Sequence, residues 1–402
     1  MGNFEIKKHI DKLLFVLALA VLAGVLIRFG IGKIASRVKP NIVFTQCWEN
    51  DLGREVLLDL IREFENTHDG IKVTLNYLPY ESLHDALLEK NNTAAFSGDV
   101  FSLDTLWIPE LLKRKTIDFY IKEGKDQQNL SVPLFSFINV FYYNIDILKN
   151  AGFSHPPKNR SEFLAFAKAV TNGAKDRWAL GMGKNSSRWI YDDIFPWIWA
   201  SGAELAKDGK PAFTSRSITE SLLFLASLEN SGLIAPDWSG ADTEKKLADF
   251  ISGRAAFMVA PAKDIAFVRE KMGEGAFSVS SIPAPDNHAG KTRYASLGWT
   301  LGISSKSTSR EKARLFADFI AEKAQTLSEK LVPAGNLTQD PLYAKVWDIS
   351  ISGENAQDFS GLPWEKLEEA FSEEFSLLLA GKASPAETAA ATQKKWEAIS
   401  SR

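Results

Sequence analysis

The chain has 402 residues, of which 45% are hydrophobic and 24% charged, a composition typical of a soluble globular protein with about two domains. Residues 1–40 are basic, whereas the remainder carries 40 basic against 48 acidic side chains, which excludes a protein that grips nucleic acid or anionic lipid by its charge. One cysteine, Cys47, and five scattered histidines exclude an internal disulfide and offer no spacing for a metal or haem. We therefore expect no cofactor, and Cys47 is predicted to be a small buried apolar residue.

The N-terminus has the layout of an export signal. Lys7, Lys8 and Lys12 precede the uncharged run LLFVLALAVLAGVLI at residues 13–27. This run is shorter than the ~18 to 20 residues that span a bilayer comfortably, although apolar residues continue beyond Arg28. Two alternatives stay open for residues 1–40: a cleaved signal peptide, or a retained membrane anchor whose N-terminus lies inside. Either one places the rest of the chain in the periplasm or on the outer face of the cytoplasmic membrane.

Strand-like apolar runs and amphipathic helices alternate in the first part of the remaining chain. The residue pattern predicts strands over 42–45, 71–75 and 99–103, and helices over 56–64 and 106–112. This alternation is typical of a mostly parallel sheet that is covered by helices.

A second block of the same kind follows Tyr143. Ser161 is the predicted N-cap of a helix that contains Phe163, and a strand is predicted over 255–259. The helical periodicity then predicts further helices over 217–230, 244–251, 311–327 and 364–379. Together the two blocks predict an α/β protein with two lobes.

Several segments, in their order along the chain, carry a family resemblance. The most specific is VFYYNIDILKNAGFSHPPKNRSEFLAFAKAVT at 140–171, and the others are GDV with Asp104 and Trp107, PWIWASGAEL at 196–205, FISGRAAFMVAP at 250–261, LGWTLGIS at 297–304 and PAG at 333–335. From Ile42 to about Ile399 the chain resembles the bacterial extracellular solute-binding proteins of the sugar type, which include the maltodextrin-binding proteins of ABC importers. Two departures concern the ligand: Ala262 stands where many sugar binders have a stacking tryptophan, and Asn159–Arg160 replaces Thr-Trp.

The resemblance implies a type II periplasmic-binding-protein fold, in which a ligand cleft lies between two lobes that are discontinuous in sequence. It places the N-terminal lobe at 41–144 plus 298–340 and the C-terminal lobe at 145–297 plus 341–402. The hinge between them is expected at Asn144, Gly298 and Asp340. Ligand contacts with both lobes would then favour the closed form.

By the same resemblance the chain delivers a sugar or oligosaccharide to an ABC permease in the inner membrane and is a monomer without enzymatic activity. Carboxylates suit sugar hydroxyls, and aromatic rings suit the apolar faces of sugars. The predicted ligand-binding residues lie at strand ends, at the returning crossing, on the helix after Pro196 (with at most one of its two tryptophans facing inward) and after Gly335: Trp48, Glu49, Asp104, Trp107, Trp197, Trp199, Trp299 and Asn336.

Alternative functions stay open at this point. The same fold with glycerol phosphate esters would need cationic residues such as Lys263 or Arg293 in the cleft, and polyamines would need extra carboxylates. A membrane-anchored sensory receptor would keep the cleft and retain residues 13–27. A glycan hydrolase would need two carboxylates about 5 to 10 Å apart, such as Glu49 and Asp104, but no nucleophile elbow, phosphate-binding glycine loop or metal spacing accompanies that pair.

Overall fold

The computed structural model describes residues 41–88, 98–115, 117–119, 134–186, 188–207, 210–331, 340–356 and 364–400. The predicted signal or anchor at 1–40 and the predicted ligand residue Asn336 lie outside the described residues. In the described part of the chain, no helix is both long enough and apolar enough to cross a membrane.

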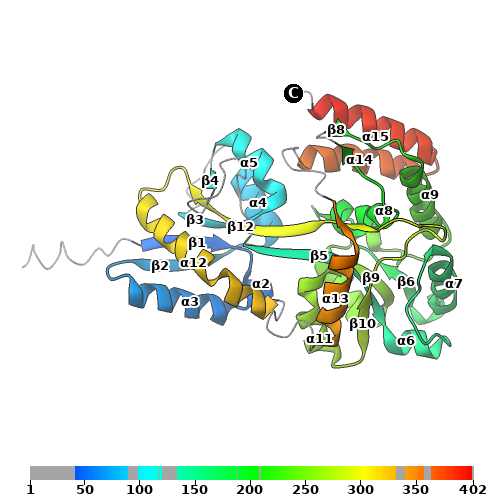
Figure 1. Cartoon of the computed structure of the whole chain (residues 1–402), viewed down its shortest axis with the longest axis horizontal. Helices are drawn as coiled ribbons and strands as arrows, with labels where there is room; N and C mark the ends of the chain where they lie inside the picture. The colour runs from blue at the N-terminus through cyan, green and yellow to red at the C-terminus, as the bar shows by residue number, and fades with distance from the viewer. Residues whose placement is uncertain are drawn as a thin grey trace, which may run out of the picture.

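The structure is a mixed α/β fold with two lobes, which lie side by side in Figure 1. A nine-stranded sheet runs through both, in the order β2-β1-β3-β12-β5-β9-β6, with β4 paired to β12 and β10 paired to β5. Two long strands, β5 (Phe135–Asn144) and β12 (Ser296–Ser304), pass from one lobe to the other. The predicted two-lobed α/β class is therefore confirmed.

The N-terminal lobe is built on parallel pairs of β1 with β2 and of β1 with β3, and on the antiparallel pair of β3 with β12. Apart from β5 and β12, its elements are β1 (Asn41–Gln46), α2 (Glu49–Leu52), α3 (Arg54–Thr67), β2 (Lys72–Tyr77), α4 (Tyr80–Leu88), β3 (Val100–Asp104), η1 (Thr105–Trp107), α5 (Ile108–Arg114), β4 (Ile117–Phe119) and α12 (Arg310–Leu331). These bounds agree with the predicted strands and helices to within a few residues, because the apolar residues repeat with the period of each element.

The C-terminal lobe surrounds the second half of β5, which pairs with β9 and β10. Its main elements are α6 (Ile145–Asn150), α7 (Arg160–Val170), β6 (Trp178–Gly181), η3 (Ile190–Ile194), α8 (Phe195–Trp199), α9 (Arg216–Asn230), α10 (Thr243–Ile251), β9 (Ala255–Pro261), η5 (Ala262–Asp264), α11 (Ile265–Met272), β10 (Phe277–Ser280), α13 (Pro341–Ser352), α14 (Trp364–Leu379) and α15 (Pro385–Ser400). Short strands complete it: β7 (Ala206–Lys207), β8 (Lys210–Pro211), β11 (Arg293–Tyr294) and β13 (Glu354–Asn355).

The start of α7 differs from the prediction. Ser161 was the expected N-cap, but the cap is Asn159, whose side chain accepts a hydrogen bond from the backbone N–H of Glu162 at 2.9 Å. Ser161 instead lies inside the first turn and binds the carboxylate of Asp286. Asparagine caps helices at least as well as serine, so the earlier of the two residues begins the helix.

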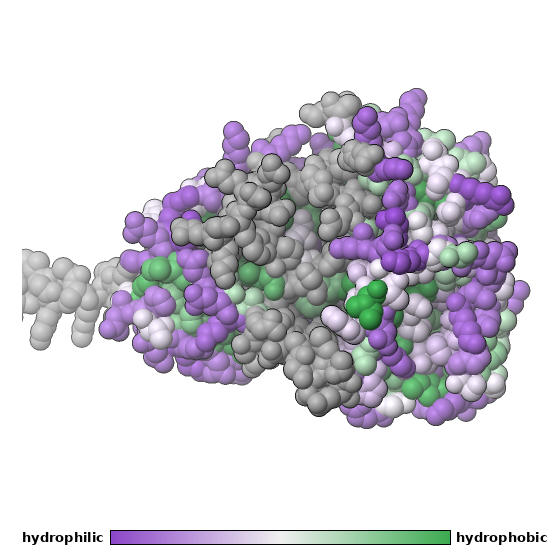
Figure 2. Space-filling view, viewed as in Figure 1, coloured by the Kyte–Doolittle hydropathy of each residue, from purple (hydrophilic) through white to green (hydrophobic). Residues whose placement is uncertain are grey.

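Separate hydrophobic cores support the two lobes. One core gathers residues from β1, β2, β3, α3 and α12, including Phe44, Phe64 and Phe316. The larger core of the C-terminal lobe is rich in aromatic rings, and Phe141, Phe163, Trp197 and Phe257 contact one another there. On the face seen in Figure 2, hydrophilic side chains cover most of the coloured outer surface. Apolar burial on this scale is the main term that stabilises each lobe.

The passage between the lobes can be located from strand register. Residues 135–138 of β5 pair with β12, whereas residues from Asn139 onward pair with β9. Gly298 pairs with Ser136 within this passage. Asn144 lies at the far end of β5, so the change of partner strand favours residues near 138–139 over Asn144 as the point where β5 changes lobes. Asp340, the third predicted hinge residue, caps α13. The predicted hinge motion itself stays a prediction.

A local role is visible for Asn144, and it makes a first prediction. Its side chain accepts a hydrogen bond from the N–H of Ile147 at 3.0 Å and caps α6. We expect Asn144→Ala to lower the free energy of unfolding by about 1 kcal/mol, because an orphan N–H of the first turn loses its acceptor. Asn144→Asp should keep the cap and most of the stability. Urea unfolding of the three proteins checks this, and equal stability of the alanine and aspartate variants would contradict it.

Candidate functional site

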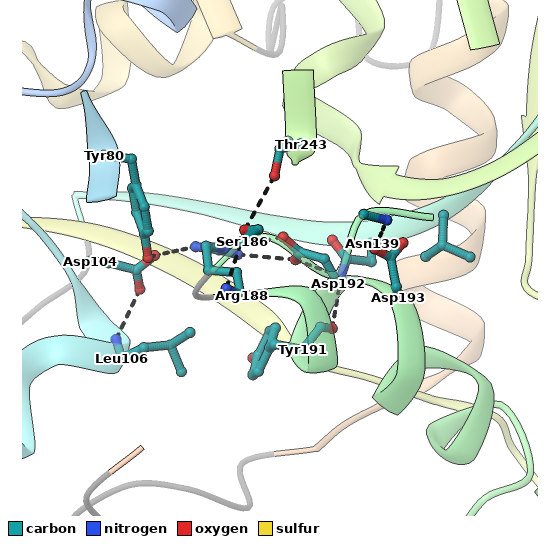
Figure 3. A network of polar contacts seen from close by, with 12 residues as sticks. Tyr80, Asp104, Leu106, Asn139, Ser186, Arg188, Tyr191, Asp192, Asp193 and Thr243 are labelled. Carbon is teal, nitrogen blue, oxygen red and sulfur yellow. Dashed lines mark hydrogen bonds and ion pairs between the residues drawn. The ribbon is translucent and has the colours of Figure 1, made fainter. Parts of the chain in front are cut away.

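Arg188 joins the two lobes. Its guanidinium forms an ion pair with Asp104 at the end of β3 and a second one with Asp192, at 3.2 Å through Nε and at 3.2 Å through Nη2. The side chain of Arg188 is 11% exposed, that of Asp104 0% and that of Asp192 6%. Figure 3 shows the guanidinium between the two carboxylates. A cation from the C-terminal lobe is thus held by one carboxylate from each lobe.

Aromatic rings from both lobes flank this guanidinium. It lies 5.5 Å from the ring centre of Tyr80 in α4 and 5.9 Å from that of Tyr191 in η3. The Tyr80 hydroxyl donates to Asp104 at 2.9 Å, and the N–H of Leu106 donates to the other oxygen at 2.9 Å. Arg188 therefore has the surroundings that stabilise a buried cation, namely carboxylates and π-faces.

A π-helical turn presents the two adjacent aspartates of the C-terminal lobe. Residues Ile190–Ile194 form this turn, and wider turns of this kind occur frequently at functional sites. Asp192 faces Arg188, and Asn139 of β5 donates to it at 3.2 Å. Asp193 faces the interior instead, where Lys246 of α10 binds it at 2.9 Å. Asp192 thus binds the cation between the lobes, and Asp193 binds a cation in the core of the C-terminal lobe.

A second cation crosses between the lobes close by. Lys263 of η5 binds Asp51 of α2 at 2.5 Å and its own neighbour Asp264 at 2.9 Å. Its ammonium lies 5.6 Å from the ring centre of Trp299, which pairs with Asp104 across the β3–β12 ladder. We refer to Asp51, Tyr80, Asp104, Arg188, Asp192 and Lys263 as the inter-lobe site.

Burial and these charges set the ionisation of the site. Burial works against the charge of Asp192, but Arg188 and Lys246 outweigh it and hold the pKa of Asp192 below its ordinary value. Burial raises the pKa of Asp51, and Lys263 only partly offsets this. Burial, with smaller contributions from Asp51 and Asp104, raises the pKa of Cys47 to about 12, so its thiol stays protonated, in keeping with a structural role.

Two of the predicted ligand residues, Asp104 and Trp299, belong to this site or adjoin it, and Trp48 and Trp107 pack against its aromatic rings. Asp104 is a member, and Trp299 adjoins it and stacks on Trp48 at 5.7 Å. Trp107 packs against Tyr80 at 4.8 Å and is 3% exposed, so it buttresses that ring. Glu49 binds Arg54 and Gln46 of its own lobe.

The predicted pair on the PWIWASG segment lies elsewhere. Trp197 is fully buried against Phe141, Phe163 and Phe224, and Trp199 is 1% exposed. The structure therefore places both tryptophans in the core of the C-terminal lobe, and this position favours packing over ligand contact. Asn336 lies outside the described residues.

Sequence reasoning missed Asp51, Tyr80, Arg188 and Asp192 of the inter-lobe site. The only local signal for them is the spacing of Arg188 and Asp192, four positions apart on a helical segment, which places an arginine and a carboxylate side by side. Nothing in the residues around Asp104 indicates a partner that lies 84 positions away. Among the described residues, no group of histidine, cysteine and acidic side chains is arranged to hold a metal ion.

Comparison with known proteins decides the family. The model of the family described as "bacterial extracellular solute-binding protein" matches residues 51–327, which is more than half of the chain. The chain belongs to this family. The predicted resemblance is thereby confirmed.

Solved structures agree on the fold of this solute-binding protein. The GacH receptor of Streptomyces glaucescens is 17% identical, with a TM-score of 0.72 over 90% of this chain and 98% of its own. A solute-binding protein from Thermotoga lettingae is 17% identical, with a TM-score of 0.71 over 90% and 99%. Another from Agrobacterium vitis is 19% identical, with a TM-score of 0.67 over 89% and 97%. At these identities the likeness shows a shared fold.

The buried carboxyl of Glu368 in α14 makes the stability of this solute-binding protein depend on pH. Burial raises its pKa well above the ordinary value, with Glu81 and Asp192 adding to the effect. Because the folded pKa exceeds the unfolded one, the carboxylate opposes folding increasingly as pH rises from about 4.5, the ordinary value. We expect Glu368→Gln to raise the free energy of unfolding at pH 7 and to change little at pH 4. Denaturant unfolding at both pH values checks this, and an equal change at both would contradict it.

Proposed function

We propose that this solute-binding protein is the substrate-binding component of an ABC importer, which captures a carbohydrate or polyol between its lobes and delivers it to a membrane permease. The observation that carries the proposal is the inter-lobe site, where Asp104 from one lobe and Asp192 from the other both bind Arg188, beside Tyr80 and Tyr191. Carboxylates accept hydrogen bonds from sugar hydroxyls, and aromatic rings stack on the apolar faces of sugars. Trp299 and Asn139 add a further ring and an amide.

Fold relatives support this ligand class by what they hold. The structures are described with acarbose for the Streptomyces receptor, α-D-tagatose for the Thermotoga protein and D-mannitol for the Agrobacterium protein. The export-like N-terminus and the extracellular character of the family support a location in the periplasm or on the outer face of the cytoplasmic membrane. Whether residues 13–27 are retained as an anchor belongs to the same proposal.

An anionic ligand is less well served by the described residues. Lys263 is already bound by Asp51 and Asp264, and Arg293 by Glu204 at 2.9 Å and Glu354 at 3.3 Å. A phosphate ester would have to displace these carboxylates. This is unfavourable at Lys263, where the partners are largely desolvated, and less so at Arg293, whose partners Glu204 and Glu354 are 37% and 46% exposed. This favours a hydroxyl-bearing ligand over glycerol phosphate esters. Asp104 is a poor candidate for the general acid of a glycan hydrolase, because its carboxylate already binds Arg188 and accepts a hydrogen bond from Tyr80.

Thermal unfolding of the full chain with and without solutes tests the proposal. A solute at 100 times its dissociation constant should add about 2.7 kcal/mol to the stability and raise the melting temperature by a few degrees. The panel contains mono- and oligosaccharides, sugar alcohols, glycerol phosphates and polyamines. We expect stabilisation by a saccharide or polyol, together with recovery of the unchanged compound afterwards. Stabilisation by phosphate esters alone, or turnover of the compound, would overturn the proposal.

A further inference from the structure

The two walls of the inter-lobe site differ in charge. On the N-terminal lobe, three carboxylates face the other lobe and contact donors there: Asp51 contacts Lys263, Asp104 contacts Arg188, and Glu81 accepts from Ser186 at 3.5 Å. On the C-terminal lobe, each of the two cations also has a carboxylate of its own, Asp264 for Lys263 and Asp192 for Arg188. The four carboxylates that bind Arg188 and Lys263 therefore outnumber these two cations, and Lys246 adds a positive charge on the far side of Asp192.

Each of these cations also lies against an aromatic ring of the N-terminal lobe. Arg188 lies over Tyr80 and Lys263 over Trp299, with the cationic centres 5.5 Å and 5.6 Å from the ring centres. Carboxylates combined with aromatic faces are the surroundings that proteins use to bind cationic ligands. The wall of the N-terminal lobe thus has the chemistry of a cation site, which the other lobe fills with its own side chains.

A buried acceptor without a donor forms a third, independent observation. Asn139 is 6% exposed, and its amide group donates to the Tyr191 carbonyl and to Asp192, which fixes its Oδ1 as the remaining atom. That Oδ1 has no hydrogen-bond partner among the described residues. This oxygen calls for a donor, which an N–H group of a ligand would supply.

Displacement of Arg188 distinguishes between ligand classes. A neutral solute that took the place of the guanidinium would leave Asp104 largely desolvated and without a counter-charge, and Asp192 with only Lys246. Such an uncompensated carboxylate is strongly destabilising. A protonated amine would replace one cation by another, keep both carboxylates paired, and bring several N–H donors to the acidic site.

We infer that the solute of this protein carries a protonated nitrogen, as an amino sugar or amino polyol does, and that this group exchanges with the guanidinium of Arg188 between Asp104, Asp192, Tyr80 and Tyr191. The inference rests on the proposed function and narrows its substrate class. Asp104 and Asp192 then determine specificity for the charge, one from each lobe, and Arg188 holds the site in the absence of solute.

Matched solute pairs test this on the full chain by calorimetric titration at pH 7: glucosamine with glucose, galactosamine with galactose, and 1-amino-1-deoxysorbitol with sorbitol. N-acetylglucosamine serves as the neutral amide. In any pair that binds, we expect the amine to bind at least ten-fold more tightly than its neutral partner. Asp104→Asn, which keeps the shape and removes the charge, should abolish that preference. Asp118→Asn, an exposed pair with Arg310 in the same lobe, should leave the preference unchanged.

The outcomes separate the inference from the proposed function. Equal or tighter binding of the neutral partner, or a preference for the amine that survives in Asp104→Asn, would overturn the inference and leave the carbohydrate proposal standing. Binding of putrescine or spermidine with no binding of any saccharide or polyol would overturn the carbohydrate proposal and keep the charge preference. The absence of binding by every compound in these sets would overturn both.

Discussion

Lys246→Met is expected to lower the free energy of unfolding by about 3 to 5 kcal/mol at pH 7, because it leaves a buried aspartate without its counter-charge. Lys246 and Asp193 are each 2% exposed, and their ion pair spans 2.9 Å in the C-terminal lobe. Lys246 also donates to the carbonyl of Val259 at 3.1 Å, and Asp193 accepts from the N–H of Gly183 at 3.1 Å. After the substitution only this last hydrogen bond remains for the carboxylate.

The pH dependence identifies the cause. Burial raises the pKa of Asp193 to about 6 even with Lys246 present, and removal of the lysine raises it further. Since the folded pKa lies above the unfolded value, the loss of stability in Lys246→Met should be largest near pH 7 to 8. It should shrink as pH falls and Asp193 takes up a proton in the folded state.

Two comparisons make this result decisive in urea unfolding. Lys246→Met combined with Asp193→Leu should recover most of the lost stability, because a buried ion pair and an apolar pair of similar size differ little. Arg216→Met removes an exposed pair with Glu220, and we expect a change of at most about 0.5 kcal/mol. A loss in Lys246→Met that is no greater than in Arg216→Met would contradict the prediction.

Arg188→Met is expected to shift the unliganded protein from the closed towards an open arrangement of its lobes. The substitution removes the cation shared by Asp104 and Asp192, and truncation of such a buried pair across an interface costs about 2 kcal/mol or more. That corresponds to a fall of about 30-fold or more in the ratio of closed to open molecules. The loss of global stability is smaller than for Lys246→Met, because opening of the lobes allows water to reach both carboxylates.

Energy transfer between dyes on α3 and α9, one in each lobe, measures this shift without any solute. The Arg188→Met protein should show a longer inter-dye distance than the parent, and Arg188→Lys should lie between them, because lysine keeps the charge but forms fewer of the hydrogen bonds. Arg216→Met again serves as the matched control on α9. Identical distances in all four proteins would show that Arg188 does not hold the lobes together.

Much of the fold was predictable because it depends on local patterns. The alternation of Ile71, Val73 and Leu75 marked β2, and the spacing of Val56, Leu57, Leu60 and Ile61 marked α3. Such periodicities reflect which face of each element is buried, and burial is visible in a sequence. The cap of α7 shows the limit: two good capping residues lie two positions apart, and only the structure shows that Asn159 caps the helix while Ser161 binds Asp286, 125 positions away.

Less of the candidate site was predictable, for a physical reason. Asp104 could be proposed because it ends a strand, but its partner Arg188 belongs to the other lobe and lies 84 positions away in the sequence. The tryptophans illustrate the same limit: Trp197 and Trp48 are equally apolar in the sequence, and only the structure shows that the first lies in the C-terminal core and the second stacks on Trp299 in the N-terminal core. Contacts between lobes leave no periodic trace in either partner.

The path of β12 has a consequence for how the protein reaches its native state. This strand completes the sheet of the N-terminal lobe between β3 and β5, and α12 then packs on the same core. Lys323 and Glu63, whose side chains meet at 2.5 Å, are 260 positions apart. The lobe that emerges first from the ribosome therefore cannot complete its sheet until three quarters of the chain has followed. Long closures of this kind slow folding, so the N-terminal lobe of a growing chain stays incomplete until β12 and α12 have been made.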